Sequence, residues 1–170
     1  MNDYTDAAPE SASDDTARQV ESLLTSGEEA SRTGDAKSAL AAFNKAISLD
    51  PSSDMAWFNR GVLLEAQQDA RGARQAFQIC LDVNPNHAPA TANLCILLER
   101  IGDEVGAYNM AIKALEFYPG HPSIVDVKNR CSGSAASKPI ASMPKVEQIE
   151  AYDQEDVATV VEETGLSDVK

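Results

Sequence analysis

Aromatic residues and long apolar runs are both scarce in this 170-residue chain. Phe, Trp and Tyr make up 5% of it, and no uninterrupted apolar run approaches the roughly 20 residues that a membrane-spanning helix needs. The N-terminus, MNDYTDAAPESASDD, has neither the basic region nor the apolar run of a signal peptide. We therefore expect a soluble, cytoplasmic protein that does not bind membranes.

Positive charge is also scarce. The chain has 14 Lys and Arg against 27 Asp and Glu, a formal net charge of −13. Both ends are acidic: residues 1–19 carry five acids and one base, and residues 134–170 carry eight acids and three bases. The middle is acidic too and its bases are scattered, so it repels phosphate backbones. We expect no nucleic-acid partner.

The chain instead contains an internal repeat of 34 residues. Five columns of residues keep this spacing, and the members of each column are alike in size or chemistry. The columns are Pro51, Pro85 and Pro119; Asp35, Asp69 and Asp103; Ala39, Ala73 and Ala107; Ala46, Cys80 and Ala114; and Gly27, Gly61 and Cys95. Such a period indicates a tandem array of one supersecondary unit.

Each column has a role in a pair of antiparallel helices. An aspartate can cap the free N–H groups that open the second helix, and Gly34 and Gly102 suit the turn that ends the first. Small residues let two helices approach closely. Each proline ends a second helix, because it lacks an N–H and restricts the residue before it. The sequence therefore predicts an all-α fold built from three helix pairs.

On these residues the chain resembles the tetratricopeptide repeat family. Residues 54–87 meet its spacing with Trp57, Gly61, Leu64, Ala73, Phe77 and Pro85. Residues 20–53 do so with Leu23, Gly27, Ala30, Ala39, Phe43, Ala46 and Pro51. Residues 88–121 keep Leu94, Leu98, Ala107, Ala114 and Pro119, but have Thr91 and Ala111 where aromatic residues are usual. The resemblance implies an α-solenoid, the superhelix typical of this family, with three repeats.

The rest of the chain divides where the composition changes. We expect residues 1–19 to be a disordered acidic segment, and residues 122–131 to form a helix that caps the open end of the solenoid. Residues 132–144 are rich in Ser, Ala and Pro, as in a flexible linker. Residues 145–170 form an acidic tail whose apolar residues have loosely helical spacing, which allows a short amphipathic helix.

The residue types that carry most enzyme chemistry are few and poorly placed for it. His87 and His121 occupy the same place in successive repeats, ~10 Å apart and too distant to share one metal ion. Cys80 and Cys95 fall in small-residue columns and are expected to be buried hydrophobes. No phosphate-binding loop, catalytic-triad spacing or metal motif is present. We therefore predict no enzyme activity, no catalytic residue, no metal and no cofactor.

The resemblance also implies a binding surface. In such solenoids the first helix of each pair lines a concave groove, faced by the second, fifth, sixth and ninth places of each repeat. We therefore expect nine residues to form a peptide-binding groove: Leu24, Glu28, Met55, Phe58, Asn59, Val62, Ala92, Asn93 and Ile96. If Trp57 is buried between helices, the adjacent Phe58 points about 100° away and becomes an exposed aromatic in the groove.

Asn59 and Asn93 both occupy the sixth place of their repeats. An amide donates and accepts hydrogen bonds at once, so such a pair suits the backbone of an extended peptide; helix-surface residues without a binding role are the alternative. Chaperone-binding members of the family combine an Asn at this place with Lys, Asn and Arg residues that clamp a terminal carboxylate. Here those other places hold Leu24, Glu28, Pro89 and Asn93. We therefore expect no carboxylate clamp, and an apolar or basic segment as the ligand.

The predicted function is that of a noncatalytic scaffold or adaptor that binds a peptide or helical segment of another protein. Two alternatives stay open: a self-associating assembly protein, and a noncatalytic subunit of an enzyme complex. The tail could also dock in the groove, because a linker of about 13 residues reaches ~20 Å and tethering raises its local concentration. The apolar residues for this docking are Val146, Ile149, Val157 and Val160. Acids on both surfaces oppose it, so a tail that binds a partner is the favoured expectation.

Overall fold

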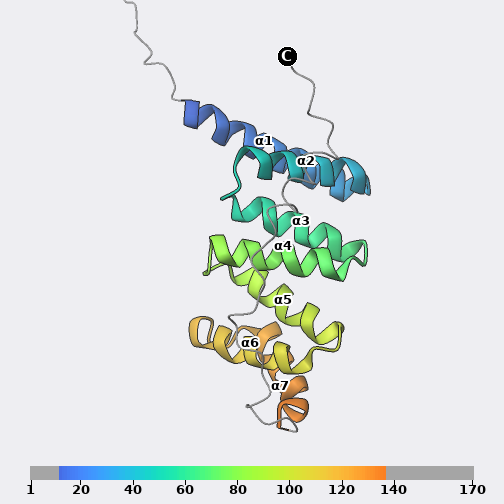
Figure 1. The fold of residues 1–170 in the computed structure, drawn as a ribbon, viewed down its shortest axis with the longest axis vertical. Helices are drawn as coiled ribbons and strands as arrows, with labels where there is room; N and C mark the ends of the chain where they lie inside the picture. Colours follow the sequence, from blue (N-terminus) through green and yellow to red (C-terminus); the bar gives the residue numbers. More distant parts are fainter. Residues whose placement is uncertain (1–11, 137–170) are drawn as a thin grey trace, which may run out of the picture.

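The computed structural model describes residues 12–136, which form seven α-helices and no strand within that range. The helices are α1 (Ala12–Thr33), α2 (Ala36–Leu49), α3 (Asp54–Ala66), α4 (Ala70–Val83), α5 (Ala88–Arg100), α6 (Glu104–Phe117) and α7 (Pro122–Ala136). They stack pair upon pair, with α1 and α2 at one end and α7 at the other (Figure 1). The prediction of an all-α solenoid is confirmed.

Two predicted boundaries differ from those observed. Helix α1 begins at Ala12, so residues 12–19 are helical although we expected disorder up to residue 19. Helix α7 continues to Ala136, past the predicted end at residue 131 and into the predicted linker. Gly133 does not end it, because its backbone is not in the left-handed conformation that stops a helix. Residues 1–11, the rest of the linker and the tail (145–170) lie outside the described residues.

The turns within the three pairs share one geometry. The aspartate that opens each second helix accepts a hydrogen bond from the backbone N–H three residues on, at 2.9–3.1 Å. These caps are Asp35, Asp69 and Asp103. The residue before each cap has a positive φ: 85° at Gly34 and Gly102, and 65° at Gln68. Glycine adopts this conformation without strain, whereas Gln68 does not.

Glycine also allows the two helices of a pair to cross closely. A Cβ atom added to Gly61 in α3 would lie 2.7 Å from the ring of Phe77 in α4, well inside the optimal carbon–carbon distance. Phe77 is fully buried, so its ring has no free space to move into. Gly27 in α1 meets Phe43 in α2 in the same way. The column at 27 and 61 therefore has the packing role predicted for it.

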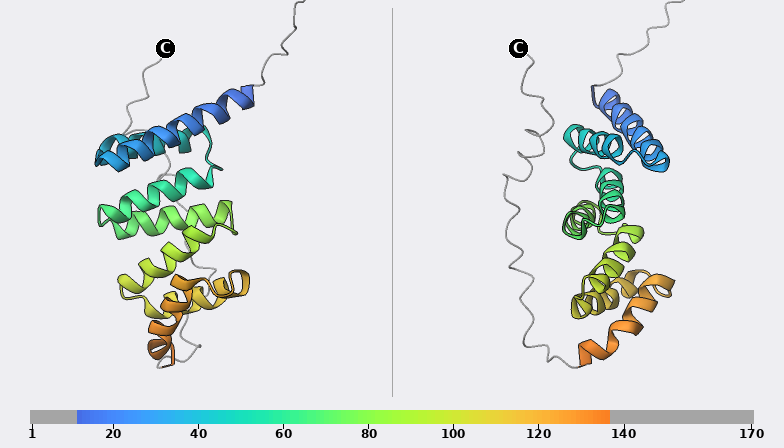
Figure 2. Two further views of the ribbon diagram at one scale, coloured as in Figure 1. Left: turned by 180° about the vertical axis from the view of Figure 1, so that it is seen from behind. Right: turned by 90° about the vertical axis from the view of Figure 1, so that its right-hand side faces the viewer.

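The first and second helices of the first two pairs lie on opposite sides of the stack, as the right-hand view of Figure 2 shows, whereas α5 and α6 overlap in that view. We call the surface of α1, α3, α5 and α7 the first-helix face, and that of α2, α4 and α6 the second-helix face. The turns that follow α2, α4 and α6 lie along one edge of the stack (Figures 1 and 2). None of the described helices has the length and apolarity that crossing a membrane requires.

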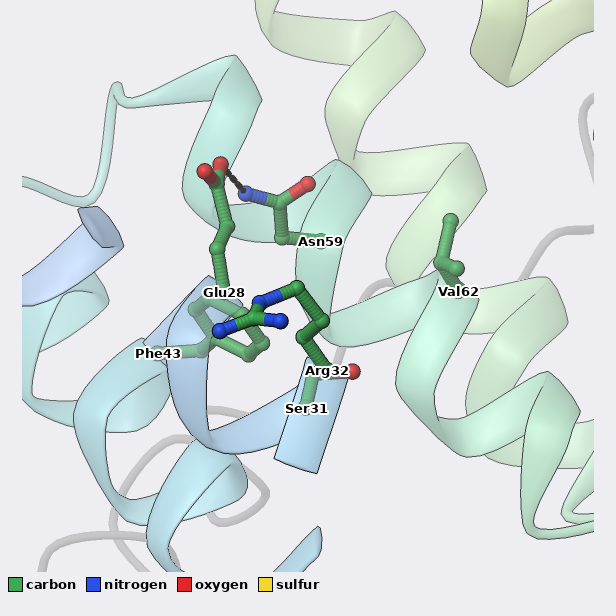
Figure 3. A pocket seen from close by; sticks show the side chains of 6 residues that line it. All are labelled: Glu28, Ser31, Arg32, Phe43, Asn59 and Val62. Carbon is green, nitrogen blue, oxygen red and sulfur yellow. Dashed lines mark hydrogen bonds between the residues drawn. The ribbon is translucent and has the colours of Figure 1, made fainter. Parts of the chain in front are cut away.

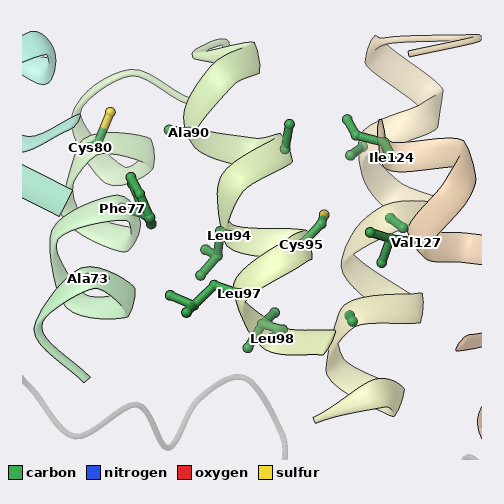
Figure 4. Close-up of a cluster of buried hydrophobic side chains, with 14 of the residues drawn as sticks. Ala73, Phe77, Cys80, Ala90, Leu94, Cys95, Leu97, Leu98, Ile124 and Val127 are labelled. Carbon is green, nitrogen blue, oxygen red and sulfur yellow. The ribbon is translucent and has the colours of Figure 1, made fainter. Parts of the chain in front are cut away.

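The largest buried cluster runs from Leu64 in α3 through α4, α5, α6 and α7, and Figure 4 shows most of it. Its biggest fully buried side chains include Phe77, Leu94 and Leu97. Helix α7 contributes Ile124 and Val127, both with 0% exposure. Through them α7 covers the apolar surface of the third repeat, which would otherwise face water.

Candidate functional site

The nine predicted groove residues all come from α1, α3 and α5, but they are not equally accessible. Met55 and Val62 in α3 are 42% and 40% exposed, and Glu28 in α1 is exposed as well. Partial exposure is shared by Leu24, Phe58, Asn59, Asn93 and Ile96. Ala92 is buried and offers almost no surface to a ligand. The accessible apolar part of the site is therefore centred on α3.

The prediction that Phe58 is an exposed aromatic is wrong. Its ring is partly buried, with its centroid 4.7 Å from that of His87 and 6.0 Å from that of Phe77. Trp57 is also only partly buried, and its Nε1 donates a hydrogen bond to the backbone oxygen of Pro51 at 2.9 Å. The prediction depended on Trp57 being buried between helices, and this condition is not met. The turn that follows α4 supplies His87 as a packing partner of Phe58.

His87 has a structural role that sequence reasoning missed. Its Nδ1 accepts a hydrogen bond from the backbone N–H of Ala90 at 3.1 Å, so it caps the N-terminus of α5. This bond requires an unprotonated Nδ1 and therefore places the ring proton of neutral His87 on Nε2. The repeat period contained the signal, because Ser53 stands 34 residues earlier and caps α3 by the same bond, to Ala56.

Polar bonds join each first helix to the next. We call the set the polar ladder, and its members are Glu28–Asn59, Glu65–Arg100 and Glu99–Arg130. The amide of Asn59 donates to Glu28 Oε1 at 2.8 Å, linking α3 to α1. Arg130 donates through Nε and Nη2 to both oxygens of Glu99, at 2.5 and 2.7 Å, and this lowers the pKa of Glu99. Each of these carboxylates is thus already bonded within the protein.

A shallow hollow of about 280 Å³ opens between α1 and α3. Its lining residues are Glu28, Ser31, Arg32, Phe43, Asn59 and Val62. Figure 3 shows the Glu28–Asn59 bond on one side of the hollow and Val62 on the other. Three of the six belong to the predicted groove. Sequence reasoning missed Ser31 and Arg32, because they occupy the twelfth and thirteenth places of the repeat and only the first nine were considered.

Reactive groups are not gathered at this site. Within residues 12–136, no three His, Cys, Asp or Glu side chains are placed to hold a metal ion. Burial raises the pKa of the Cys80 and Cys95 thiols to about 12, so neither is a thiolate at neutral pH. What the described site offers another molecule is its exposed apolar and polar side chains.

Two family models of the tetratricopeptide repeat match the chain, one over residues 20–53 and the other over residues 42–75. The chain belongs to the tetratricopeptide repeat family. The first match has the bounds predicted for repeat one, and the helix pairs α3–α4 and α5–α6 continue the same architecture.

Several solved tetratricopeptide repeat structures share the fold. The Arabidopsis OM64 TPR domain matches with a TM-score of 0.64 at 15% identity, over 70% of this chain and 98% of that one. MamA matches with a TM-score of 0.63 at 21% identity, over 69% of this chain and 68% of that one. The first TPR domain of Spaghetti (RPAP3), bound to an HSP90 peptide, matches with a TM-score of 0.65 at 15% identity, over 70% of this chain and 94% of that one. No curated protein sequence matches the chain.

Proposed function

We propose that this tetratricopeptide repeat protein is a noncatalytic interaction module that binds an apolar segment of another protein on its first-helix face. The observation that carries the proposal is the exposed pair Met55 and Val62, 42% and 40% accessible. They stand seven residues apart on α3, which places them on the same side of the helix two turns apart. An exposed apolar patch on a solvated helix is typical of an interaction surface.

Residues of the flanking helices extend this apolar surface. Ile96 in α5 has the place in its repeat that Val62 has in α3, and it is partly exposed. Leu24 in α1 is partly exposed as well. Asn93 and Asn59 add polar groups at matching places, although Asn59 first has to share its amide with Glu28. The ligand that fits is a segment with several apolar side chains.

The chemistry of the face disfavours a ligand held by its terminal carboxylate. Fold relatives are solved with chaperone peptides, such as SRMEEVD on Spaghetti (RPAP3). In this chain Asn59 is bonded to Glu28, which brings a negative charge to the place of a clamp residue. Arg100 and Arg130 are paired with Glu65 and Glu99. A peptide carboxylate would therefore compete with carboxylates of the protein for each of these donors.

The test is a peptide selection on the immobilised full-length chain, followed by titration of the selected peptides. We expect the selected peptides to be rich in apolar residues and to bind Val62→Asp at least ~10-fold more weakly than wild type. Ile112→Asp is the matched control, because Ile112 is 39% exposed but lies in α6 on the second-helix face. The synthetic peptide SRMEEVD should not bind.

Two outcomes would overturn the proposal. Equal affinity of the selected peptides for wild type and Val62→Asp would remove the first-helix face as their site. Binding of SRMEEVD that is lost in Asn59→Ala would show that a carboxylate clamp operates after all.

A further inference from the structure

A second set of exposed apolar residues repeats with the 34-residue period, and it lies on the second helices. Leu49, Val83 and Phe117 are the last residues of α2, α4 and α6, and they are 37%, 38% and 70% exposed. The other large apolar residues exposed in the described part of the chain share no place in the repeat: Met55, Val62, Ile101 and Ile112. We call Leu49, Val83 and Phe117 the apolar row.

The apolar row follows the edge of the stack at which α2, α4 and α6 end (Figures 1 and 2). Helix α3 packs between α2 and α4, and α5 packs between α4 and α6. At up to ~10 Å for each packed pair, the three side chains span at most ~40 Å, which a segment of about 18 residues covers in a partly extended conformation. The row therefore has the dimensions of a docking surface for one short segment.

Unpaired cations stand beside the row. Lys45 and Lys113 precede Leu49 and Phe117 by four residues, which places each lysine on the same side of its helix as the apolar residue. Neither lysine makes a hydrogen bond or an ion pair within residues 12–136. Two acids on these helices, Asp82 and Glu116, directly precede row residues and lie about 100° around the helix from them. A third acid, Asp50, directly follows Leu49, and its carboxylate accepts two hydrogen bonds from Ser52.

The two faces differ in charge. Helices α2, α4 and α6 carry five Lys and Arg against three Asp and Glu. Helices α1, α3, α5 and α7 carry six Lys and Arg against nine Asp and Glu. The second-helix face is thus the positive side of a protein whose net charge is −13. An acidic segment with apolar residues complements the row in both respects.

We propose that residues 146–163 of this chain, in its acidic C-terminal tail, dock on the apolar row. This segment contains seven Asp and Glu and no Lys or Arg. Its apolar residues for the row are Val146, Ile149, Val157, Val160 and Val161. In the docked state these side chains cover Leu49, Val83 and Phe117, and carboxylates of the segment lie beside Lys45 and Lys113.

The tail is long enough to reach the row. Helix α7 has 15 residues and begins close to Phe117, so its end at Ala136 lies within ~22 Å of that residue. The ten residues from Ala136 to Val146 span up to ~33 Å when extended, which brings Val146 to Phe117 and leaves the rest of the segment to run along the row toward Leu49. Tethering gives the segment an effective concentration in the millimolar range, so modest contacts suffice to hold it there.

This docking leaves the first-helix face open, in contrast to docking of the tail in the groove. On the first-helix face the tail would meet Glu28, and the nearby Arg100 and Arg130 are paired with acids of the protein. On the second-helix face it meets free lysines. The inference is independent of the proposed function, because the two concern opposite faces and different residues.

The test is zero-length carbodiimide cross-linking of the full chain, with mass spectrometry of the isopeptides. Residues 12–136 contain four lysines, of which Lys45 and Lys113 flank the row and Lys37 and Lys128 do not. Cross-links from residues 147–163 should favour the row lysines at least ~5-fold, after normalisation to the acetylation rate of each lysine. In a mixture of ¹⁵N-labelled and unlabelled chains, the two peptides of each cross-linked pair should carry the same label, because both come from one molecule.

A matched pair of variants completes the experiment. Phe117→Ser removes the most exposed member of the row and should lower these cross-links at least ~3-fold, whereas Ile112→Ser on the same helix should leave them unchanged. An even distribution over the four lysines, mixed-label pairs as the main product, or no effect of Phe117→Ser would each overturn the proposal. Peptide binding to the first-helix face should be the same in Phe117→Ser and wild type, so failure of one proposal does not imply failure of the other.

Discussion

Replacing Gly61 by alanine adds one methyl group at the crossing of α3 and α4. Helix propensity alone predicts that the free energy of unfolding rises by about 1 kcal/mol, because glycine is that much less favourable than alanine in a helix interior. The crossing opposes this gain. The new Cβ would lie 2.7 Å from Cδ1 and Cε1 of Phe77 and 3.2 Å from Cζ. Overpacking of this kind costs about 1–3 kcal/mol.

The upper half of that range applies at Gly61, because the Phe77 ring is fully buried and cannot move aside. We therefore expect Gly61→Ala to lower the free energy of unfolding by about 1–2 kcal/mol, the overpacking cost less the propensity gain. Gly133→Ala in α7 is the control, since no atom lies within 4 Å of its added Cβ. There the propensity gain stands alone, about 1 kcal/mol at most.

Urea unfolding of the full chain, followed by circular dichroism at the helix band, measures both effects. With an m-value of about 2 kcal/mol/M, the middle of the range for urea, the midpoint of Gly61→Ala should fall by roughly 0.5–1 M and that of Gly133→Ala should rise. If Gly61→Ala raised the midpoint as Gly133→Ala does, the close crossing would not be the reason for glycine at this place. Removing the ring should relieve the overlap, so Gly61→Ala should cost less in a Phe77→Leu background than in wild type.

Gln68→Gly should raise the free energy of unfolding by about 0.5–1 kcal/mol, because it relieves a φ of 65° that only glycine adopts freely; an unchanged melting temperature would contradict this. Hydrogen bonds from Ser38 hold the pKa of Asp35 below its ordinary value of 3.8. The stability from Asp35 is therefore present above that value and lost as the pH falls through the lower folded pKa. Between about pH 5 and pH 2, the melting temperature of Asp35→Asn should fall by less than that of wild type. Iodoacetamide at about pH 8 should leave Cys80 and Cys95 unlabelled in the folded chain and label both in urea, since their pKa is about 12 when folded; labelling of the folded chain would mean that α4 and α5 separate.

The repeat period predicted most of the fold, because each column reflects an interaction that is short in sequence or confined to one helix pair. The cap at Asp103 needs only the N–H of Gly106. The place of Gly61 needs only the ring of Phe77 in the next helix. Such requirements recur in every repeat and so leave a regular pattern.

The candidate site was harder to predict, because its contacts join different repeats. The Glu28–Asn59 and Glu65–Arg100 bonds depend on how one repeat is rotated against the next. No column of similar residues encodes that rotation. The apolar row could not be predicted for another reason. One apolar residue at the end of a helix is ordinary, and only their exposure in the structure distinguishes Leu49, Val83 and Phe117 from buried residues at other places.

The three bonds of the polar ladder differ in how strongly dissolved salt weakens them. Glu65–Arg100 and Glu99–Arg130 join two opposite charges, and both arginines are more than half exposed, at 52% and 55%, so dissolved salt weakens these bonds. Glu28–Asn59 has one neutral partner, and screening weakens it less. As ionic strength rises, the two ion pairs on either side of α5 weaken before the Glu28–Asn59 bond between α1 and α3. There the buried cluster that joins α4 to α7 holds the helices together at any salt concentration, whereas the wall of the hollow keeps its own polar bond.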